Sequence, residues 1–543
     1  MAASRKVTTA QDSVIRTVIR HYPIDVPSFS ISRAVFLRLL GAVYLIAFAS
    51  LTVQVTGLVG ENGLMPVGEF LSRAHEVYGS SAYRLFPTLA WLSPTGAFLT
   101  LLSWTGVALS IVLVLGIVPV LTTTLLWALY LALTIAGQEF LQFQWDALLL
   151  ETGLLAILYS PLAWRSRLHS DAEPPAVVRW VLWGLAFKVT FLSGMTKILS
   201  GDPTWANLTA LTYHYETQPL PLPTSWYAHQ LPPLVHLWSA AAMFAIEIAA
   251  PWLALAPARF RRARQVGCAL MIALQLGIGA TGNYGFFNLL TIVLYVALLD
   301  DRTFDGLFQR VRRVIWQVRR RGFSRRRNLP YPEEICGAGP AGGGHAVGGG
   351  RARPLINIIA ICLAALSVMA LFREMDLTWG RRTALSYLWS PRVLTWIAPL
   401  DSVNGYGLFR VMTTERPEIV VEVSEDGMTW KEYPFRWKPG DVIRRPALVE
   451  PHMPRLDWQM WFAALGPESA QGWLSRLVER LGAGDAAVMR LLGPNPLTRA
   501  PRYARLAYYQ YRFTTRDDRA RTGAWWRRQF VGHLTNTIDL QVR

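Results

Sequence analysis

Long apolar stretches separated by short polar connections fill the first 372 positions of the chain. About twenty apolar residues are enough for a helix to cross the hydrocarbon core of a bilayer. Nine segments meet or approach this length: 34–53, 97–118, 120–137, 145–164, 176–199, 233–256, 266–282, 286–299 and 354–372. The fourth segment is weakened by Asp146 and Glu151, and the eighth is short. The pattern predicts an α-helical polytopic membrane bundle of about nine transmembrane helices.

The pattern changes after the ninth segment, where residues 373–543 have the composition of a water-exposed domain. Residues 418–423 (EIVVEV) carry β-branched residues in an alternating pattern, 424–427 (SEDG) form a turn signal, and 429–437 (TWKEYPFRW) return as a second strand. These features are typical of a β-hairpin. Further elements are expected as a strand at 503–514 and helices at 473–481 and 486–492. We therefore expect a β-rich α+β C-terminal domain.

Charge placement orients the predicted bundle. Every second connection is basic, and the connections between them at 137–144, 200–232 and 281–285 contain no Lys or Arg. Cytoplasmic loops of membrane proteins carry an excess of Lys and Arg. The N-terminus is therefore predicted to be cytoplasmic, and everything after Phe372 is predicted to be extracytoplasmic.

Together these patterns divide the chain into five parts. They are a cytoplasmic N-terminal arm (1–33), a transmembrane helical bundle (34–299), a basic, Gly-rich cytoplasmic linker (300–353), a last transmembrane helix (354–372) and the extracytoplasmic β-rich domain (373–543). The linker holds RRRGFSRRR followed by GAGPAGGGHAVGGG. Such a run cannot bury enough apolar surface to order itself, so we expect a flexible connector in which His345 is not a ligand.

The amino-acid composition limits the kinds of partner that the protein is expected to have. The chain is 52% hydrophobic and 17% charged and contains 22 Trp, which favours a membrane protein. The net charge of +18 comes from arginines that lie beside apolar spans, as orientation signals and lipid-headgroup contacts do. We therefore expect a lipid bilayer as a partner and no nucleic acid. Cys268, Cys336 and Cys362 give neither a disulfide framework nor a CxxC metal pattern.

Several ionisable residues lie within predicted spans, and five of them are candidates for a role. Asp146, Glu151, Lys188 and Glu247 are deep enough to need partners, and Lys188 has the three carboxylates to choose from. Intramembrane ionisable residues are often functional, but a structural ion pair is an equal alternative. Lys197 lies near the outer end of its span, where snorkelling to headgroups competes with chemistry or ligand contact.

The loop after Lys197 is rich in aromatic and polar residues, and it is the first candidate for contact with clients or ligands. The candidate residues are Asp202, Trp205, His214, Tyr215 and Glu216. A metal site built from His214, Glu216 and His229 is disfavoured, because the three residues lack an HxxxH or HExxH frame. We expect neither a metal nor a cofactor. Asn283, Tyr284 and Asn288, at the outer end of the eighth span, are expected to form hydrogen bonds with neighbouring helices.

A second candidate lies in the predicted exterior domain. Arg455, Asp457, Trp458 and Trp461 form an aromatic and polar cluster. Exposed aromatic patches can hold unfolded or partner chains, whereas Trp at such spacing is more often part of a core. Both interpretations stand at this point.

Several blocks of the sequence resemble the lipase maturation factor family. They are FLQFQWDALLLETG (140–153), KILSGDPTWANLTALTYHYETQPLPLPTSWYAHQLP (197–232), GNYGFFNLLTIVL (282–294), NGYGLFRVMTTERPEIVVE (404–422), EPHMPRLDWQMWFAALG (450–466), and RYARLAYYQYRF followed by GAWWRR near the C-terminus. The resemblance implies a polytopic protein that helps secreted lipases to fold and assemble. Animal members of this family lie in the endoplasmic reticulum membrane, with a large C-terminal domain that faces the lumen.

The resemblance makes a membrane-bound maturation or folding factor the first hypothesis, with exported or secreted clients such as lipases. The family location implies the endoplasmic reticulum membrane for eukaryotic relatives, whereas the high Arg and Ala content of this chain suggests a bacterial cytoplasmic membrane. The predicted exterior domain contains no cysteine, which argues against thiol exchange.

A shorter resemblance supports an enzyme as the alternative. FLSGMTKILSGDPTW (191–205) is similar to a segment of vitamin K-dependent γ-glutamyl carboxylases, in which a membrane lysine is proposed as the catalytic base. Lys197 matches that lysine, so the alternative is a membrane-embedded, carboxylase-like enzyme with Lys197 as base. A lipid or small-molecule transporter is a second alternative, although no inverted repeat is evident. No common hydrolase or nucleotide-binding motif is present in the sequence.

Overall fold

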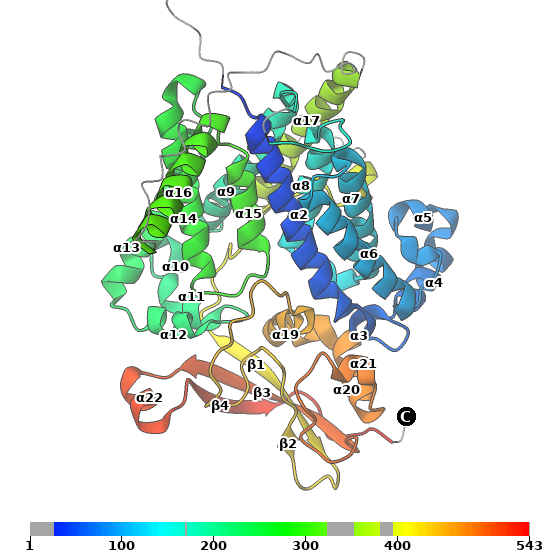
Figure 1. Ribbon diagram of the computed structural model, residues 1–543. Helices are drawn as coiled ribbons and strands as arrows, with labels where there is room; N and C mark the ends of the chain where they lie inside the picture. Colours follow the sequence, from blue (N-terminus) through cyan, green and yellow to red (C-terminus); the bar gives the residue numbers. More distant parts are fainter. Residues whose placement is uncertain (1–26, 169–170, 323–351, 381–394, 542–543) are drawn as a thin grey trace, which may run out of the picture.

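A computed structural model describes residues 27–168, 171–322, 352–380 and 395–541 of the chain. Helices form an upright bundle in the first two-thirds, and a twisted sheet lies across one end of it (Figure 1). Most of the N-terminal arm and the Gly-rich part of the linker, with His345 and Cys336, lie outside the described residues.

Each of the apolar segments predicted from the sequence coincides with a helix. These helices are α2 (Ser30–Thr52), α6 (Gly96–Val114), α7 (Pro119–Ala136), α8 (Gln144–Tyr159), α9 (Ala176–Leu199), α13 (Pro233–Ala254), α14 (Arg261–Gly279), α15 (Phe287–Val296) and α17 (Ala352–Trp379). Six of them, α2, α6, α7, α9, α13 and α17, are long and apolar enough to cross a membrane. Helix α8 has 16 residues, α15 has 10, and α14 begins with an arginine-rich turn. Six candidate spans are therefore supported within the described residues, and the count of about nine stays a prediction.

Glycines allow close contact between neighbouring helices at two places. A Cβ on Gly106 of α6 would lie 2.3 Å from the ring of Phe48 on α2. A Cβ on Gly267 of α14 would lie 2.7 Å from the backbone of Ala250 and of Ala254 on α13. Real Cβ atoms do not approach other atoms so closely, so a larger residue would push these helix pairs apart.

The start of α2 is held by a residue far away in the sequence. Helix α2 has no side-chain cap of its own. The carboxylate of Asp301, the first residue of α16 (Asp301–Gly322), instead accepts hydrogen bonds from the backbone N–H groups of Ser30 and Ser32, each at 3.0 Å. These bonds satisfy free donors in the first turn of the helix, and the negative charge suits the helix N-terminus.

The longer connections fold into short helices. Those between α2 and α6 are α3 (Val55–Val59), α4 (Val67–Tyr78) and α5 (Ala82–Leu85), and those between α9 and α13 are α10 (Pro203–Ala206), α11 (Leu211–Thr217) and α12 (Pro223–His229). Asp202 caps α10, because its Oδ1 accepts a hydrogen bond from Thr204 N at 2.7 Å. The predicted outer loop is thus a packed layer of short helices at the sheet end of the bundle (Figure 1).

The C-terminal region forms one antiparallel sheet. Its strands are β1 (Arg416–Ser424), β2 (Lys431–Glu432), β3 (Tyr503–Phe513), β4 (Trp526–His533) and β5 (Ile538–Asp539). The order is β2-β1-β3-β4, and β5 pairs with β3. The alternation that predicted the strand at 503–514 is confirmed by β3, the central strand. Strand β4 was not expected, because its arginine-rich sequence hides the alternation.

The predicted hairpin is confirmed, but its second strand is much shorter than expected. Glu422 of β1 pairs with Glu432 of β2, and β2 ends there. Pro434 has no N–H to donate to a ladder, and Phe435 forms an isolated bridge with Leu492 instead. The rest of the 429–437 segment therefore leaves the sheet.

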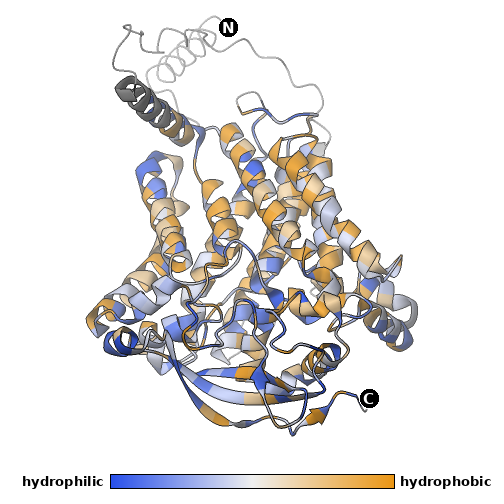
Figure 2. Ribbon diagram, turned by 60° about the horizontal axis from the view of Figure 1, so that its bottom comes forward, coloured by the Kyte–Doolittle hydropathy of each residue, from blue (hydrophilic) through white to orange (hydrophobic). Residues whose placement is uncertain are grey.

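Four helices accompany the sheet: α19 (Arg455–Leu465), α20 (Gln471–Gly482), α21 (Ala486–Met489) and α22 (Arg516–Thr522). Helices α20 and α21 confirm the two helices expected at 473–481 and 486–492, whereas α19 and α22 were not expected. Helix α19 lies between the sheet and the bundle (Figure 1). Apolar residues dominate the long helices, and polar and apolar residues mix on the sheet (Figure 2). This distribution agrees with two different surroundings for the two regions.

Candidate functional site

A buried ion pair joins the C-terminal region to the bundle. Arg455, the first residue of α19, binds Asp146 in the first turn of α8 through two contacts, Nη1 to Oδ2 at 2.5 Å and Nη2 to Oδ1 at 2.7 Å. The hydroxyl of Tyr130 also donates to Asp146 Oδ1. The two charged residues are 1% and 0% exposed. A buried pair of this kind is costly to break, because removing one partner leaves the other charge buried and unpaired.

The end of α2 holds the chain just before α19. Gln54 Oε1 accepts a hydrogen bond from Arg455 N at 2.9 Å, and Gln54 Nε2 donates to Met453 O at 2.9 Å. Ser50 Oγ accepts from Met453 N at 3.0 Å. Helices α2 and α8 together therefore fix the position of α19.

A second buried pair tethers the segment that precedes the sheet. Lys188 Nζ lies 2.6 Å from Glu151 Oε1, so of the three carboxylates considered for Lys188 the structure selects Glu151. Tyr406 donates its hydroxyl to Glu151 Oε2 at 2.7 Å, and Asn404 N donates to the same oxygen at 3.2 Å. This buried pair therefore also positions the C-terminal region.

Three predicted contact residues of the outer loop bind the same region. Asp202 Oδ2 accepts from Met412 N at 2.6 Å, and Trp205 Nε1 donates to Phe409 O at 3.0 Å. Glu216 Oε2 accepts from Phe513 N at 2.9 Å. All three side chains are buried between the loop and the C-terminal region. Their contact with a client stays a prediction.

The aromatic and polar cluster of α19 is also buried. Trp461 Nε1 donates to Thr217 O at 2.8 Å, and the ring of Trp458 packs edge-on against Trp145. Asp457 Oδ1 accepts from the backbone N–H groups of Trp437 and Lys438, at 3.0 and 2.9 Å. Burial raises the pKa of Asp457 to about 6. The cluster packs against the bundle and its own region, which agrees with the core interpretation, and its role toward clients stays a prediction.

Sequence reasoning missed Arg416, the residue that begins β1. Its guanidinium lies 2.8 Å from Glu418 and donates to the carbonyl oxygens of Glu216 at 2.8 Å and Pro219 at 2.9 Å, and also to that of Gln218. It is 1% exposed. No sequence signal marks it, because an arginine at the start of a strand is usually solvated.

A cavity of about 440 Å³ lies beside Lys197 and is lined by residues of α9, α10, α11, α13, α14 and α15 and by Leu408 and Phe409. Lys197 Nζ lies 3.0 Å from each carboxylate oxygen of Glu247 on α13 and donates to Ser193 O at 2.9 Å. The structure thus brings together two residues that the sequence placed fifty positions apart, and both face an open space. Lys197–Glu247 is therefore, after Lys188–Glu151, the second ion pair between charged residues that were both predicted to lie within spans.

His214 and Tyr215 line the same cavity. Burial lowers the pKa of His214 to about 4, so its ring is neutral at pH 7. Its Nε2 lies 3.1 Å from the hydroxyl of Tyr284, which donates to Gln218 Oε1 at 2.8 Å. Of the predicted loop residues, His214, Tyr215 and Trp205 are therefore the ones that line the cavity.

Asn283 and Asn288, which were both expected to form hydrogen bonds with neighbouring helices, differ in the structure. Asn283 Nδ2 donates to Leu220 O and Ala447 O, each at 3.0 Å, and its Oδ1 accepts from Val449 N at 2.9 Å. It therefore joins the loop and the C-terminal region. Asn288 has no hydrogen-bond partner for either amide atom among the described residues, although it is 5% exposed.

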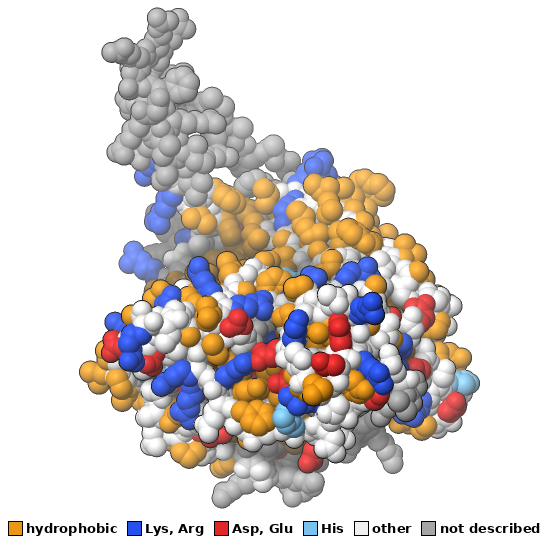
Figure 3. All heavy atoms as spheres, turned by 90° about the horizontal axis from the view of Figure 1, so that it is seen from below, with side chains coloured by type: hydrophobic (Ala, Val, Ile, Leu, Met, Phe, Trp, Pro, Cys, Tyr) orange, Lys and Arg blue, Asp and Glu red, His pale blue; other side chains and the backbone are white. Residues whose placement is uncertain are grey.

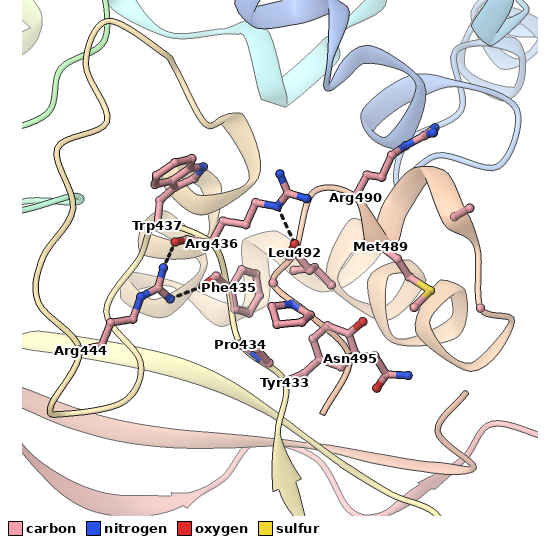
Figure 4. Close-up of a pocket in the computed structure, with 14 residues that line it drawn as sticks. Tyr433, Pro434, Phe435, Arg436, Trp437, Arg444, Met489, Arg490, Leu492 and Asn495 are labelled. Atoms are coloured by element: carbon pink, nitrogen blue, oxygen red, sulfur yellow. Dashed lines mark hydrogen bonds between the residues drawn. The ribbon is translucent and has the colours of Figure 1, made fainter. Parts of the chain in front are cut away.

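A wider groove of about 850 Å³ lies in the C-terminal region itself (Figure 4). Arg444 donates to Phe435 O at 2.5 Å, and Arg436 Nε donates to Leu492 O at 2.7 Å, so these arginines hold the two walls in place. Arg490 and Met489 lie along the opposite wall (Figure 4). None of its fourteen lining residues is acidic. The groove therefore combines apolar surface with positive charge.

The described residues contain no group of three or more His, Cys, Asp or Glu side chains that could hold a metal ion. Glu216 Oε2 and His229 Nε2 lie 3.7 Å apart. Cys268 and Cys362 are free within the same part of the chain.

Comparisons with known proteins cover both regions. The family described as "Lipase maturation factor transmembrane domain" matches residues 31–306, and the one described as "Lipase maturation factor C-terminal domain" matches residues 402–536. Human lipase maturation factor 2 is 36% identical over 94% of this chain and 82% of its own length. Mouse lipase maturation factor 1 is 32% identical over 99% of this chain and 93% of its own length, and human lipase maturation factor 1 is 33% identical over 95% and 89%. No solved structure matches the chain.

Proposed function

Since this chain belongs to the lipase maturation factor family, we propose that it acts as a membrane-bound maturation factor that assists exported proteins, lipases among them, in folding. The observation that carries the proposal is similarity to named lipase maturation factors across both the helical and the C-terminal region. The alternatives are less favoured. A general base must reach its substrate, whereas the amine of Lys197 is engaged by both oxygens of Glu247 at 3.0 Å and by Ser193 O at 2.9 Å.

The proposed orientation places the C-terminal region on the extracytoplasmic or lumenal side. The loops without Lys or Arg, 200–232 and 281–285, are those next to the sheet, and Asp202, Glu216 and Asn283 bind the C-terminal region. The arginine-rich connection at 259–264 lies at the opposite ends of α13 and α14. Because basic loops favour the cytoplasm, this arrangement supports an N-terminus inside and the sheet outside. The membrane would be the endoplasmic reticulum membrane or a bacterial cytoplasmic membrane.

We assign client contact to the groove of Figure 4. It combines exposed arginines with apolar side chains, and an unfolded segment that is apolar and acidic would suit it. The face of the molecule that is seen from below mixes hydrophobic, basic and acidic side chains (Figure 3). The Arg455–Asp146 pair would hold the groove at a fixed distance from the bundle, next to a client that is leaving the membrane.

Co-expression with a secreted lipase tests the proposal. The full-length protein, Arg490→Glu and the matched control Arg445→Glu are compared, since Arg445 is exposed but does not line the groove. We expect Arg490→Glu to lower the yield of active lipase and its co-purification with the factor, and Arg445→Glu to keep both. Equal yields with and without the wild-type factor would refute the maturation function. Equal yields for the two variants would refute client contact at the groove.

A further inference from the structure

The cavity beside Lys197 contains buried polar atoms that nothing in the described protein satisfies. Asn288 lacks a partner for both Nδ2 and Oδ1, Gln275 for Oε1 and His214 for Nδ1. Asn288 and Gln275 are 5% and 8% exposed, and all three residues line the cavity. Leaving a buried donor or acceptor unpaired costs about 1–3 kcal/mol, so such atoms are rare unless a site has a bound group.

The remaining lining is apolar. Met243 and Ile246 of α13, Leu274 and Ile278 of α14, and Phe287 of α15 form the walls around the polar atoms. A cavity with apolar walls and a few convergent polar atoms is the usual form of a site for a small amphipathic molecule.

The cavity opens between α13 and α14. These helices touch at Gly267, but a Cβ on Gly277, about three turns further along α14, would meet no atom within 4 Å. Ser239 and Ala242 of α13 and Ala273 of α14 line the cavity and are exposed. Small, exposed residues of both helices therefore line the cavity toward the sheet end, where they leave a side opening. In a membrane such an opening would face the lipid.

The charges in the cavity restrict the head of the ligand. Lys197 and Glu247 neutralise each other at 3.0 Å, and His214 is neutral at pH 7. A charged head would therefore be buried without a counter-ion, which is costly. A head with a hydroxyl and a carbonyl can donate to Gln275 Oε1 and accept from Asn288 Nδ2.

We propose that this cavity binds an uncharged, hydroxyl-bearing acyl lipid of the acylglycerol type, which enters between α13 and α14 with its head at Asn288 and Gln275. The site is independent of the proposed function, because it involves neither the groove nor a client. It goes beyond the maturation role by giving the membrane region a ligand of its own.

Photolabelling of the full-length protein in phosphatidylcholine nanodiscs tests the site. The probe is a diacylglycerol with a diazirine in its acyl chain. We expect label in peptides from 233–254 and 261–279 that excess unlabelled diacylglycerol removes. Ala242→Phe should block the opening and lower the labelling at least about tenfold, which corresponds to about 1.4 kcal/mol of binding free energy. Ala245→Phe, on an exposed position of α13 outside the cavity lining, should label like the wild type.

A second variant keeps the test valid if Ala242→Phe misfolds. Gln275→Leu combined with Asn288→Leu removes the unpaired polar atoms, and it should lower labelling while thermal stability stays equal or rises. Labelling that survives both variants, or that unlabelled diacylglycerol does not compete, overturns the proposal. Equal competition by phosphatidic acid overturns the uncharged head. The readout needs no lipase, so failure here leaves the proposed function standing, and failure of lipase maturation leaves the labelling result standing.

Discussion

Two buried ion pairs of this molecule differ in their surroundings. Arg455 and Asp146 meet at the junction of the C-terminal region and the bundle, in a bidentate pair that Tyr130 completes. Lys197 and Glu247 meet at 3.0 Å beside an open cavity, in which both amide atoms of Asn288 and Gln275 Oε1 lack partners among the described residues. A buried charge pair alone therefore does not reveal a role. What surrounds the pair distinguishes a structural joint from a candidate binding site.

The largest effect is expected from breaking the junction. Arg455→Ala leaves Asp146 charged and buried, which should cost about 3–5 kcal/mol. We expect detachment of the C-terminal region, measured as faster limited proteolysis after Phe372 and a lower unfolding temperature in detergent. The double variant Arg455→Ala with Asp146→Ala should recover part of the loss, because it removes the stranded charge. A double variant no more stable than Arg455→Ala would contradict a role for the pair.

Removal of the cation beside the cavity should cost less. Lys197→Ala leaves Glu247 without its partner, but water can enter the open space and solvate the carboxylate. We expect a loss of about 1–3 kcal/mol, as for an unsatisfied buried group. Thermal unfolding compared side by side with Arg455→Ala measures the difference. A loss equal to or larger than that of Arg455→Ala would show that the two pairs are not distinguished by their surroundings.

The pH dependence of the junction tests Asp457. Burial raises the pKa of Asp457 in the fold to about 6, above its ordinary value of 3.8. The folded state therefore holds this proton more tightly than the unfolded chain, and the stabilisation is present below about pH 4 and lost as pH rises through 6. Asp457→Asn keeps the Oδ1 acceptor that both backbone N–H groups use.

We expect the stability of the wild type relative to Asp457→Asn to fall by about 1–3 kcal/mol between pH 4 and pH 7, since one pKa unit corresponds to about 1.4 kcal/mol. Denaturant unfolding at several pH values measures this difference. The comparison also cancels His452 and His214, whose pKa values burial lowers to about 4 and whose effect has the opposite sign. A difference that does not change with pH would show that Asp457 is charged throughout.

The smallest effect is expected at an exposed pair that joins the same two regions. Arg476 lies 2.7 Å from Glu69, and the two side chains are 30% and 62% exposed. Arg476→Ala should change the stability by less than about 1 kcal/mol, because solvent screens such a pair. The change in unfolding temperature, compared with that of Arg455→Ala, gives the contrast between a buried and an exposed contact. Equal losses would mean that burial is not what makes the junction strong.

Much of the fold could be predicted because periodicity is local. The apolar segments coincide with helices, and the alternation at 503–514 with β3, since both patterns follow from the geometry of single elements. Helix α19 and strand β4 escaped this reasoning. The tryptophans and charges of α19 pack against two regions at once, and the arginines of β4 hide its alternation. Such elements depend on distant neighbours more than on their own pattern.

The candidate sites could be predicted from the sequence only in part. Lys188 needed a carboxylate, and the chain offered three. Asp202, Glu216 and Arg455 could be recognised in the sequence as polar residues among aromatic ones. Their neighbours in the sequence did not indicate their partners, which are Met412 N, Phe513 N and Asp146, respectively. Gln275 gave no signal, because an isolated amide in an apolar helix is equally compatible with a bonded and an unbonded state.

The sequence by itself determined that this protein has an apolar helical part with alternating basic connections, followed by a sheet-forming region, and that its blocks belong to one family. Hydrophobicity and charge act residue by residue, so they can be read along the chain. The tertiary structure alone decided which charges neutralise one another, and that Asn288 and Gln275 face an open space. Those outcomes depend on distances between segments that are tens to hundreds of positions apart along the chain, and only the packed chain sets these distances.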